Sequence, residues 1–138
     1  MTEYVAGFMF SGYAVALVKK NRPTWQAGKY NGIGGHVEAG EFPLYAMVRE
    51  FREETGCPTM LGDWYKFAVL ESNDWRVHFY FTEGDVHSLK STTDEEIVVV
   101  NVEDITMENA IPNLSWLIPM AKSMHLGRAN YFTIKEEY

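Results

Sequence analysis

The apolar and polar positions of the chain first separate into short runs that predict strands. Apolar and aromatic residues fill 4–10 and 13–18, and the Ser-Gly pair between these runs is typical of a tight turn. Residues 64–70 and 75–82 repeat this arrangement around a polar Glu-Ser-Asn-Asp segment. Residues 97–102 predict one more strand, short and buried. We therefore expect two pairs of strands and a fifth strand.

Two further segments carry apolar residues at the three- and four-residue spacing of a helix. In the first, residues 44–55, Pro43 suits the first turn and Gly56 suits the end. The second, residues 114–125, stops ahead of Gly127. Strands and helices in this order predict a mixed α/β sandwich.

The connection at 21–40 is long and rich in Gly, Pro and Asn, which is typical of a functional loop. Lys19, Lys20 and Arg22 stand where this loop begins. They are candidates for binding substrate phosphates, and solvated turn charge is the equal alternative. Arg22 is the first choice, because arginine makes bidentate contacts with phosphate and Pro23 restrains the backbone beside it.

Length and charge narrow the class of protein. The 138 residues suit one domain over 1–138, and 46% hydrophobic with 22% charged residues is ordinary globular composition. The net charge of -7 argues against binding a nucleic acid polymer, which requires a surplus of Lys and Arg. If the substrate is itself a phosphate anion, a divalent cation held by some of the carboxylates would resolve the repulsion.

The cysteine count and the N-terminal run indicate the compartment. Cys57 is the only cysteine, so an intramolecular disulfide and a cysteine-rich zinc site are both excluded. The apolar run at 4–18 has Glu3 in place of a basic flank and is interrupted by a Ser-Gly pair, so it does not resemble a signal peptide. We expect a cytoplasmic protein that does not associate with membranes.

The first predicted helix places three carboxylates on one face: Glu50, Glu53 and Glu54. Like charges at this spacing destabilise a helix by tenths of a kcal/mol per pair, and a bound divalent cation would explain why they are tolerated. A solvated acidic face is the alternative for the cluster alone. Its context favours a metal site, because the Gly34-Gly35 turn can add a carbonyl oxygen and Arg49 can pair with Glu53 or Glu41.

The segment from Gly35 to Cys57 resembles the Nudix box, G-x5-E-x7-R-E-U-x-E-E-x-G-U, in which U is a bulky apolar residue. Every fixed position of the pattern is met, and Cys57 stands where an aliphatic residue is usual. The resemblance implies an α/β/α Nudix sandwich with a mixed β-sheet between helices. It also implies attack by water on a nucleoside diphosphate linked to another group, assisted by Mg²⁺ or by Mn²⁺ in its place.

The resemblance further implies roles for the residues of the box. Glu53 and Glu54 would be the principal metal ligands, Glu50 a ligand or the general base, and the carbonyl of Gly34 a further ligand. Glu41 and Arg49 would form an ion pair that holds the loop on the helix. Members of the family often add a carboxylate from a later loop. Asp94, Glu95 and Glu96 are in that region, and we choose Glu95 as a metal ligand, with surface charge as the alternative.

Three positions are candidates for binding the substrate: Arg22, Gly35 and Asn113. Asn113 follows Ile111-Pro112 in a segment similar to the one in MutT-like enzymes where an Asn reads a purine, but it also suits a helix N-cap. Four aromatic residues could stack on a base, although in so aromatic a chain we expect most such rings in the core: Trp25, Tyr30, Phe81 and Trp116.

The first functional hypothesis is hydrolysis of a nucleoside triphosphate to the monophosphate and pyrophosphate by a monomer or homodimer. The same box would serve cleavage of dinucleoside polyphosphates or nucleotide sugars, because specificity is determined elsewhere on the fold. A third hypothesis is a nucleotide sensor that binds without catalysis. Such a protein should have lost a helix carboxylate, and this chain has all three.

Overall fold

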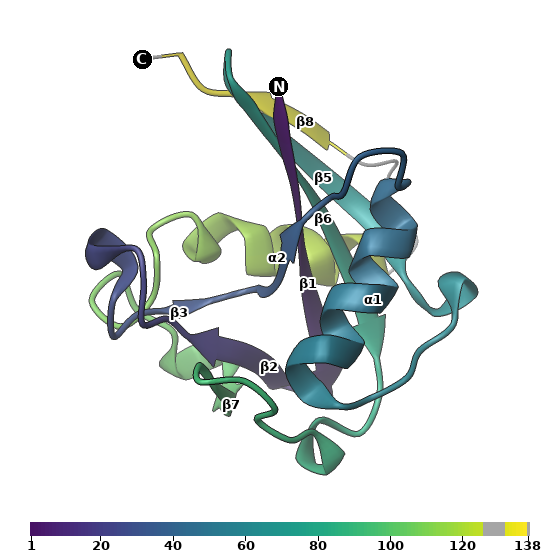
Figure 1. Ribbon diagram of the computed structural model, residues 1–138. Coiled ribbons are helices and arrows are strands. Elements are labelled where there is room, and N and C mark those ends of the chain that lie inside the picture. The colour runs from purple at the N-terminus through teal and green to yellow at the C-terminus, as the bar shows by residue number, and fades with distance from the viewer. Residues whose placement is uncertain (126–131, 138) are drawn as a thin grey trace.

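The computed structural model describes residues 1–125 and 132–137. Within them, one mixed sheet runs in the order β3-β2-β1-β6-β5-β8, with β4 paired to β1 and β7 paired to β2. The strands are β1 (Thr2–Ser11), β2 (Ala14–Lys19), β3 (Tyr30–Asn31), β4 (Ile33–His36), β5 (Tyr65–Glu71), β6 (Trp75–Glu83), β7 (Glu96–Asn101) and β8 (Phe132–Lys135). Helix α1 (Pro43–Thr55) lies on one face and α2 (Leu114–His125) on the other (Figure 1).

Strand β1 is the centre of this arrangement. Along one edge it pairs in parallel with β6 from Thr2 to Phe10. Along the other edge its first half pairs with β4, from Tyr4 opposite His36 to Gly7 opposite Ile33, and its last residues pair with β2. The glycine-rich loop after β2 therefore returns to the sheet as β4, next to the start of α1.

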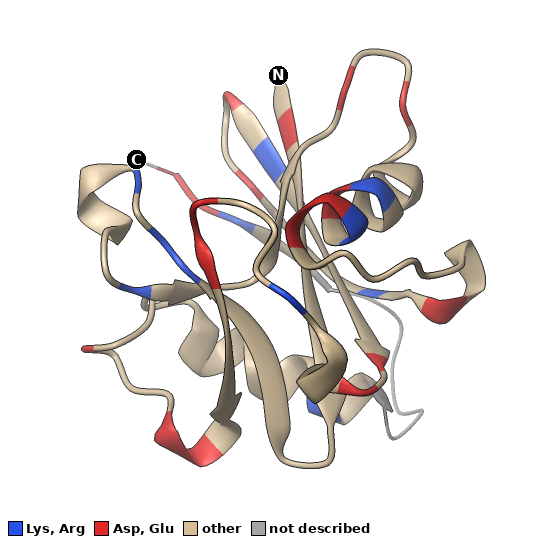
Figure 2. Cartoon of the chain, turned by 60° about the horizontal axis from the view of Figure 1, so that its bottom comes forward, with Lys and Arg blue, Asp and Glu red and all other residues tan. Residues whose placement is uncertain are grey.

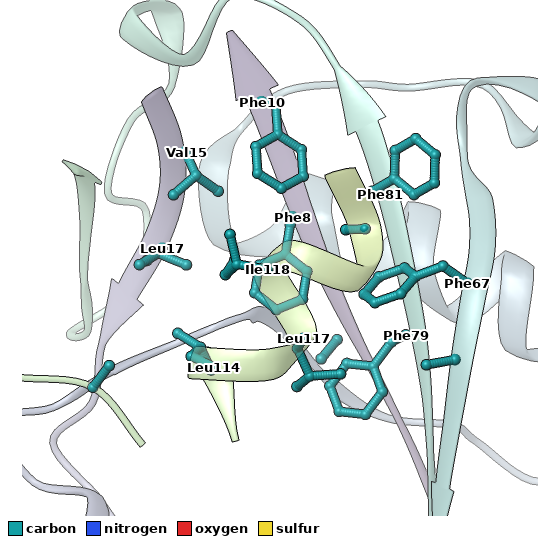
Figure 3. Close-up of a cluster of buried hydrophobic side chains, with 14 of the residues drawn as sticks. Phe8, Phe10, Val15, Leu17, Phe67, Phe79, Phe81, Leu114, Leu117 and Ile118 are labelled. Atoms are coloured by element: carbon teal, nitrogen blue, oxygen red, sulfur yellow. The ribbon is translucent and has the colours of Figure 1, made fainter. Parts of the chain in front are cut away.

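The two faces of the sheet bury different sets of side chains, as the period of two along a strand requires. Figure 3 shows the first set, in which Phe8, Phe67 and Phe79 pack beneath Leu117 of α2. The second set lies under α1 and includes Val5, Met9, Met47, Phe51 and Trp64. The predicted α/β sandwich and its two helices are therefore confirmed.

Helix α1 begins and ends where its sequence signals predict. Pro43 occupies the first turn, and Phe42 at the N-cap position makes no side-chain hydrogen bond to the helix. At the other end Gly56 adopts a left-handed φ of 73°, and its N–H donates to the Arg52 carbonyl. A side chain with Cβ would be strained at this position.

The strand predicted at 97–102 is present as β7, but the prediction that it is buried is wrong. β7 is a half-exposed edge strand, and Val99 keeps 39% of its surface accessible. The reason is that β7 pairs with β2 on one side and adds one face to the core. Strands β3, β4 and β8 were not expected, because each is short and gains its partners from distant segments. Gly127, expected beyond α2, lies outside the described residues.

No helix in the described ranges combines the length and the apolar character that crossing a membrane requires.

Candidate active site

The carboxylate face of α1 is packed against the glycines of β4. A Cβ on Gly35 would lie 2.6 Å from the Glu50 carboxylate, and a Cβ on Gly34 would lie 1.9 Å from the backbone oxygen of Val5. Gly34 therefore lets β4 approach β1, and Gly35 leaves room for the Glu50 carboxylate. The two glycines are adjacent but have different roles.

Arg49 is the centre of an ion-pair network on α1, where charges of both signs lie together (Figure 2). Its Nε and Nη2 donate to the two oxygens of Glu41 at 2.8 and 2.9 Å, a bidentate pair. Nη1 donates to Glu50 Oε1 at 2.9 Å and lies 3.3 Å from Glu53 Oε2. Nη2 also donates to the His36 carbonyl at 2.9 Å. Arg49 thus joins the loop, strand β4 and the helix, and the expected ion pair with Glu41 is present.

The environments of these carboxylates differ. The Arg49 guanidinium holds the pKa of Glu41 below its usual range. Burial raises the pKa of Glu50 despite the contact with Arg49, and burial also raises the pKa of Glu54. Two half-buried carboxylates with raised pKa values on one helix face indicate a candidate functional site.

Glu95 lies beside this face, but both of its oxygens are engaged. Its carboxylate is buried, with Oε1 accepting from Lys20 Nζ at 2.9 Å and Oε2 accepting from the Asn21 amide at 2.6 Å. The neighbouring Thr93 donates its hydroxyl to Glu54 Oε2 at 3.0 Å. The loop that carries Glu95 is thus fastened to both the helix and the start of the long loop.

A cleft of about 740 Å³ opens on the α2 side of the sheet and reaches the two glycines. Its floor is apolar, formed by Ala6, Leu70, Val77 and Phe79, and Lys20, Arg22 and Trp25 lie on one wall. Asn113 faces it from the start of α2, and its buried Oδ1 has no hydrogen-bond partner among the described residues. A buried acceptor left unpaired costs free energy, so this atom is suited to a ligand that donates.

Comparison with known proteins decides the family. The family model described as the NUDIX domain matches residues 4–120, most of the chain. The chain belongs to the Nudix family. It is also 30% identical over 80 residues to the CTP pyrophosphohydrolase of Escherichia coli (strain K12), a match that covers 58% of this chain and 59% of that protein.

Solved structures agree with the Nudix fold. The MutT protein from Bacillus halodurans superposes with a TM-score of 0.73 at 15% identity, covering all of this chain and 90% of that one. A NUDIX hydrolase from Nitrosomonas europaea gives 0.72 at 14% identity, covering 99% and 79%. The expected Nudix α/β/α sandwich is therefore confirmed, and so is the expectation of a MutT-like member of this hydrolase family.

Nudix hydrolases generally use divalent metals, and the side chains present suit such an ion. Among residues 1–125 and 132–137, no three acidic, histidine or cysteine side chains form a closed ligand cluster. Glu50 and Glu53 turn to Arg49 instead, and Glu54 turns to Thr93. Magnesium is rarely held by an all-protein cage, since it usually takes one or two carboxylates, several waters and substrate phosphates. An open set of hard oxygens beside the Gly35 cradle fits that preference.

The three substrate candidates from the sequence, Arg22, Gly35 and Asn113, all line the same cleft. Arg22 lies on the cleft wall, exposed and paired with Asp94. The interpretation of the Asn113 side chain as a helix cap is wrong, because its Oδ1 accepts from no backbone amide. Tyr30, Phe81 and Trp116 belong to the core or pack against it, as expected for most of these rings, whereas Trp25 is 63% exposed on the cleft wall.

Residues that the sequence analysis did not single out also lie near the site. Trp75 and Glu136 line the cleft, and Thr93 contacts Glu54. Trp75 alternates with Val77 and Phe79 on β6, a pattern that could have placed it on this face. Glu136 follows β8, and its amide donates to the Glu71 carbonyl at 2.8 Å. No local pattern marks Glu136 or Thr93.

Proposed function

We propose that this Nudix chain is a Mg²⁺-dependent pyrophosphohydrolase that converts a nucleoside triphosphate to the monophosphate and pyrophosphate. The observation that carries the proposal is the meeting of the cleft with α1 at Gly34 and Gly35. A nucleotide with its base over the apolar floor would extend its phosphates across these glycines toward the helix carboxylates. The phosphate-phosphate bond to be cleaved would then lie where the cleft meets the proposed ligands of the metal ion.

The carboxylates would hold the ion and activate the water. Glu53, Glu54 and the Gly34 carbonyl are the ligands we propose, with Glu50 as a further ligand or the general base. Magnesium bound there would neutralise phosphate oxygens and lower the pKa of a water. Burial raises the pKa of Glu50, which makes it a stronger base than an ordinary carboxylate.

Arg49 and Glu41 would hold this constellation in place without touching the substrate. Arg49 contacts Glu41 of the loop and Glu50 of the helix, so its loss would release the loop and a carboxylate together. Among the described residues, Lys20 and Arg22 are the lysine and the arginine that line the cleft, and both are paired with acidic residues of one loop. Glu95 would then be a later metal ligand that Lys20 keeps oriented.

The part of the cleft near Asn113, which we propose binds the base, favours a nucleotide whose base carries a hydrogen-bond donor. The unpaired Oδ1 of Asn113 is an acceptor, so it would favour an amino group over a carbonyl oxygen. Cytosine, adenine and guanine carry such a group, and uracil and thymine do not. The name of the Escherichia coli relative, a CTP pyrophosphohydrolase, is consistent with a triphosphate of this kind. We place the activity in the cytoplasm, in keeping with the single cysteine.

The test is a substrate panel with matched variants. Pure protein is incubated with the common nucleoside triphosphates, oxidised purine nucleotides, nucleotide sugars and dinucleoside polyphosphates, with and without Mg²⁺, and products are separated by chromatography. Glu53→Gln and Glu54→Gln remove one proposed ligand each. Glu103→Gln, an exposed carboxylate outside the cleft lining, is the control.

The expected result is monophosphate plus pyrophosphate from a triphosphate, dependent on Mg²⁺ and reduced at least about 100-fold in both ligand variants. The control should keep wild-type turnover. Faster turnover of a dinucleoside polyphosphate or a nucleotide sugar would replace the substrate class and leave the chemistry intact. Binding without turnover across the panel would overturn the hydrolase and support the sensor hypothesis.

A further inference from the structure

A segment far from the Nudix box in sequence runs along the last turn of α1. The amide of Lys90 donates to the Thr55 carbonyl at 3.1 Å, and the amide of Thr92 donates to the Glu54 carbonyl at 3.2 Å. The Thr92 hydroxyl donates to the Glu53 carbonyl. The final carbonyls of a helix have no partner within the helix, so these contacts cap it from outside.

Thr93 makes a different kind of contact from Thr92. Its hydroxyl lies 3.0 Å from Glu54 Oε2 and 3.5 Å from the Glu95 carbonyl, and it accepts the Glu95 amide at 3.3 Å. A hydroxyl has one proton, and a charged acceptor at the shorter distance takes it. The amide therefore fixes the hydroxyl so that its proton points at the Glu54 carboxylate.

The support behind Thr93 is itself anchored. Glu95 is held by Lys20 and the Asn21 amide, and the Asn21 side chain donates to the Asp94 carbonyl at 2.8 Å. The loop that presents Thr93 is thus bound on one side to α1 and on the other to residues at the start of the long loop. Such a double attachment leaves the hydroxyl little freedom to move.

We propose that Thr93 is a positioning residue that orients the Glu54 carboxylate for the metal ion. The inference rests on the proposed function, in which Glu54 is a ligand. The hydroxyl occupies one lone pair of Oε2 and fixes the plane of the carboxylate. Within the described residues, Oε1 accepts no hydrogen bond and is left to the ion. Partners that orient a ligand commonly change metal affinity by 10- to 100-fold, so Thr93 should do so without touching metal or substrate.

Adjacent threonines provide a matched pair of variants. Thr93→Val keeps the shape and removes the hydroxyl from a carboxylate, whereas Thr92→Val removes a hydroxyl from a backbone carbonyl. Mn²⁺ is titrated into each protein without nucleotide, and the free ion is measured by electron paramagnetic resonance. We expect Thr93→Val to weaken Mn²⁺ binding about 10-fold. Thr92→Val should keep the affinity and lower the thermal midpoint by about 3 °C.

Two more variants separate the possible failures. Thr93→Ser retains the hydroxyl and should bind Mn²⁺ within about twofold of wild type. If Thr93→Val does not fold, Thr93→Ala takes its place against Thr93→Ser. Glu54→Gln tests the ligand itself. If Glu54→Gln binds Mn²⁺ as wild type does, the proposed metal site is wrong. If Glu54→Gln loses the ion but removal of the Thr93 hydroxyl does not weaken binding, the inference about Thr93 alone is overturned.

Kinetics give a second readout. Loss of the Thr93 hydroxyl should raise the Mg²⁺ concentration needed for half-maximal rate. At saturating Mg²⁺ it should leave the KM for nucleotide within about twofold, because the residue does not line the cleft. A parallel rise in nucleotide KM would mean that Thr93 shapes the cleft. That outcome would contradict a role confined to Glu54.

Discussion

The two ends of the site are built in opposite ways. At the carboxylate end, Arg49 satisfies Glu41, Glu50 and the His36 carbonyl within a stretch of fifteen positions, from 36 to 50. At the cleft end, the lining comes from strands and loops spread between residues 4 and 136, and a buried acceptor on Asn113 has no partner. The charges at the carboxylate end pair with one another, whereas the acceptor at the cleft end is available to a ligand.

The carboxylate end holds the groups proposed for catalysis, and the cleft end holds the groups proposed for substrate recognition. A dense local network holds reacting groups in fixed positions, which is what phosphoryl transfer needs from a protein. A cleft shared among distant segments can change one wall without moving the carboxylates. Variants at the carboxylate end should therefore alter turnover and stability, and variants at the cleft end should alter affinity for nucleotide.

The largest effects are expected at the paired glycines. Gly34→Ala drives a Cβ to within 1.9 Å of the Val5 carbonyl, and because backbone cannot swing aside it should cost about 3 kcal/mol of unfolding free energy. Gly35→Ala meets only the mobile end of Glu50, so it should cost about 1 kcal/mol but lower kcat about 100-fold. Denaturant unfolding and steady-state kinetics measure both. Equal stability losses would show that the two glycines do not have separate roles.

Arg49→Met should come next. It leaves Glu41 and Glu50, both largely buried, without their cation, and the cost should be about 2 kcal/mol, below that of a fully buried pair because Arg49 is 26% exposed. Arg49→Lys should recover less than half of this, since a single ammonium cannot make the bidentate pair. Full recovery by lysine, seen in urea unfolding, would mean that charge alone matters.

Asn113→Leu should have opposite effects on stability and on binding. Replacing an unpaired buried acceptor by an apolar side chain of similar size should stabilise the fold by about 1 kcal/mol, whereas KM for an amino-bearing nucleotide should rise about 10-fold. Thermal unfolding and initial rates test the two signs. A loss of stability would indicate that the side chain caps α2 after all.

The smallest effect on stability is expected for Trp25→Ala. The ring is 63% exposed on the cleft wall, so the unfolding free energy should change by less than about 0.5 kcal/mol. If the ring stacks on the base, KM should rise several-fold, and the quenching of tryptophan fluorescence by a non-hydrolysable nucleotide should fall. Unchanged KM and unchanged quenching would restrict the cleft end to Asn113 and the apolar floor.

Prediction from the sequence succeeded for features that depend on residues close together in the chain. The two hairpins and both helices depend on periodicity and turn residues within a few positions, and the structure confirms them. The predicted burial of the strand at 97–102 was wrong, because burial depends on neighbouring elements and β7 has β2 on one side. Glu41 and Arg49 were paired correctly, whereas for Asn113 a helix cap and a contact with the base remained alternatives.

By itself, the sequence determined the carboxylate helix, and its resemblance to the Nudix box implied the clamp between Arg49 and Glu41. The prediction of a turn at Gly34-Gly35 is wrong, because these residues lie in strand β4 and pair with β1. Only the tertiary structure decided that Thr93 bonds to Glu54, that Lys20 holds Glu95 and that Glu136 reaches the cleft. The hydrogen bonds among them join residues that are 39 or more positions apart in the chain. The order of the strands in the sheet, rather than a local sequence pattern, makes such residues neighbours.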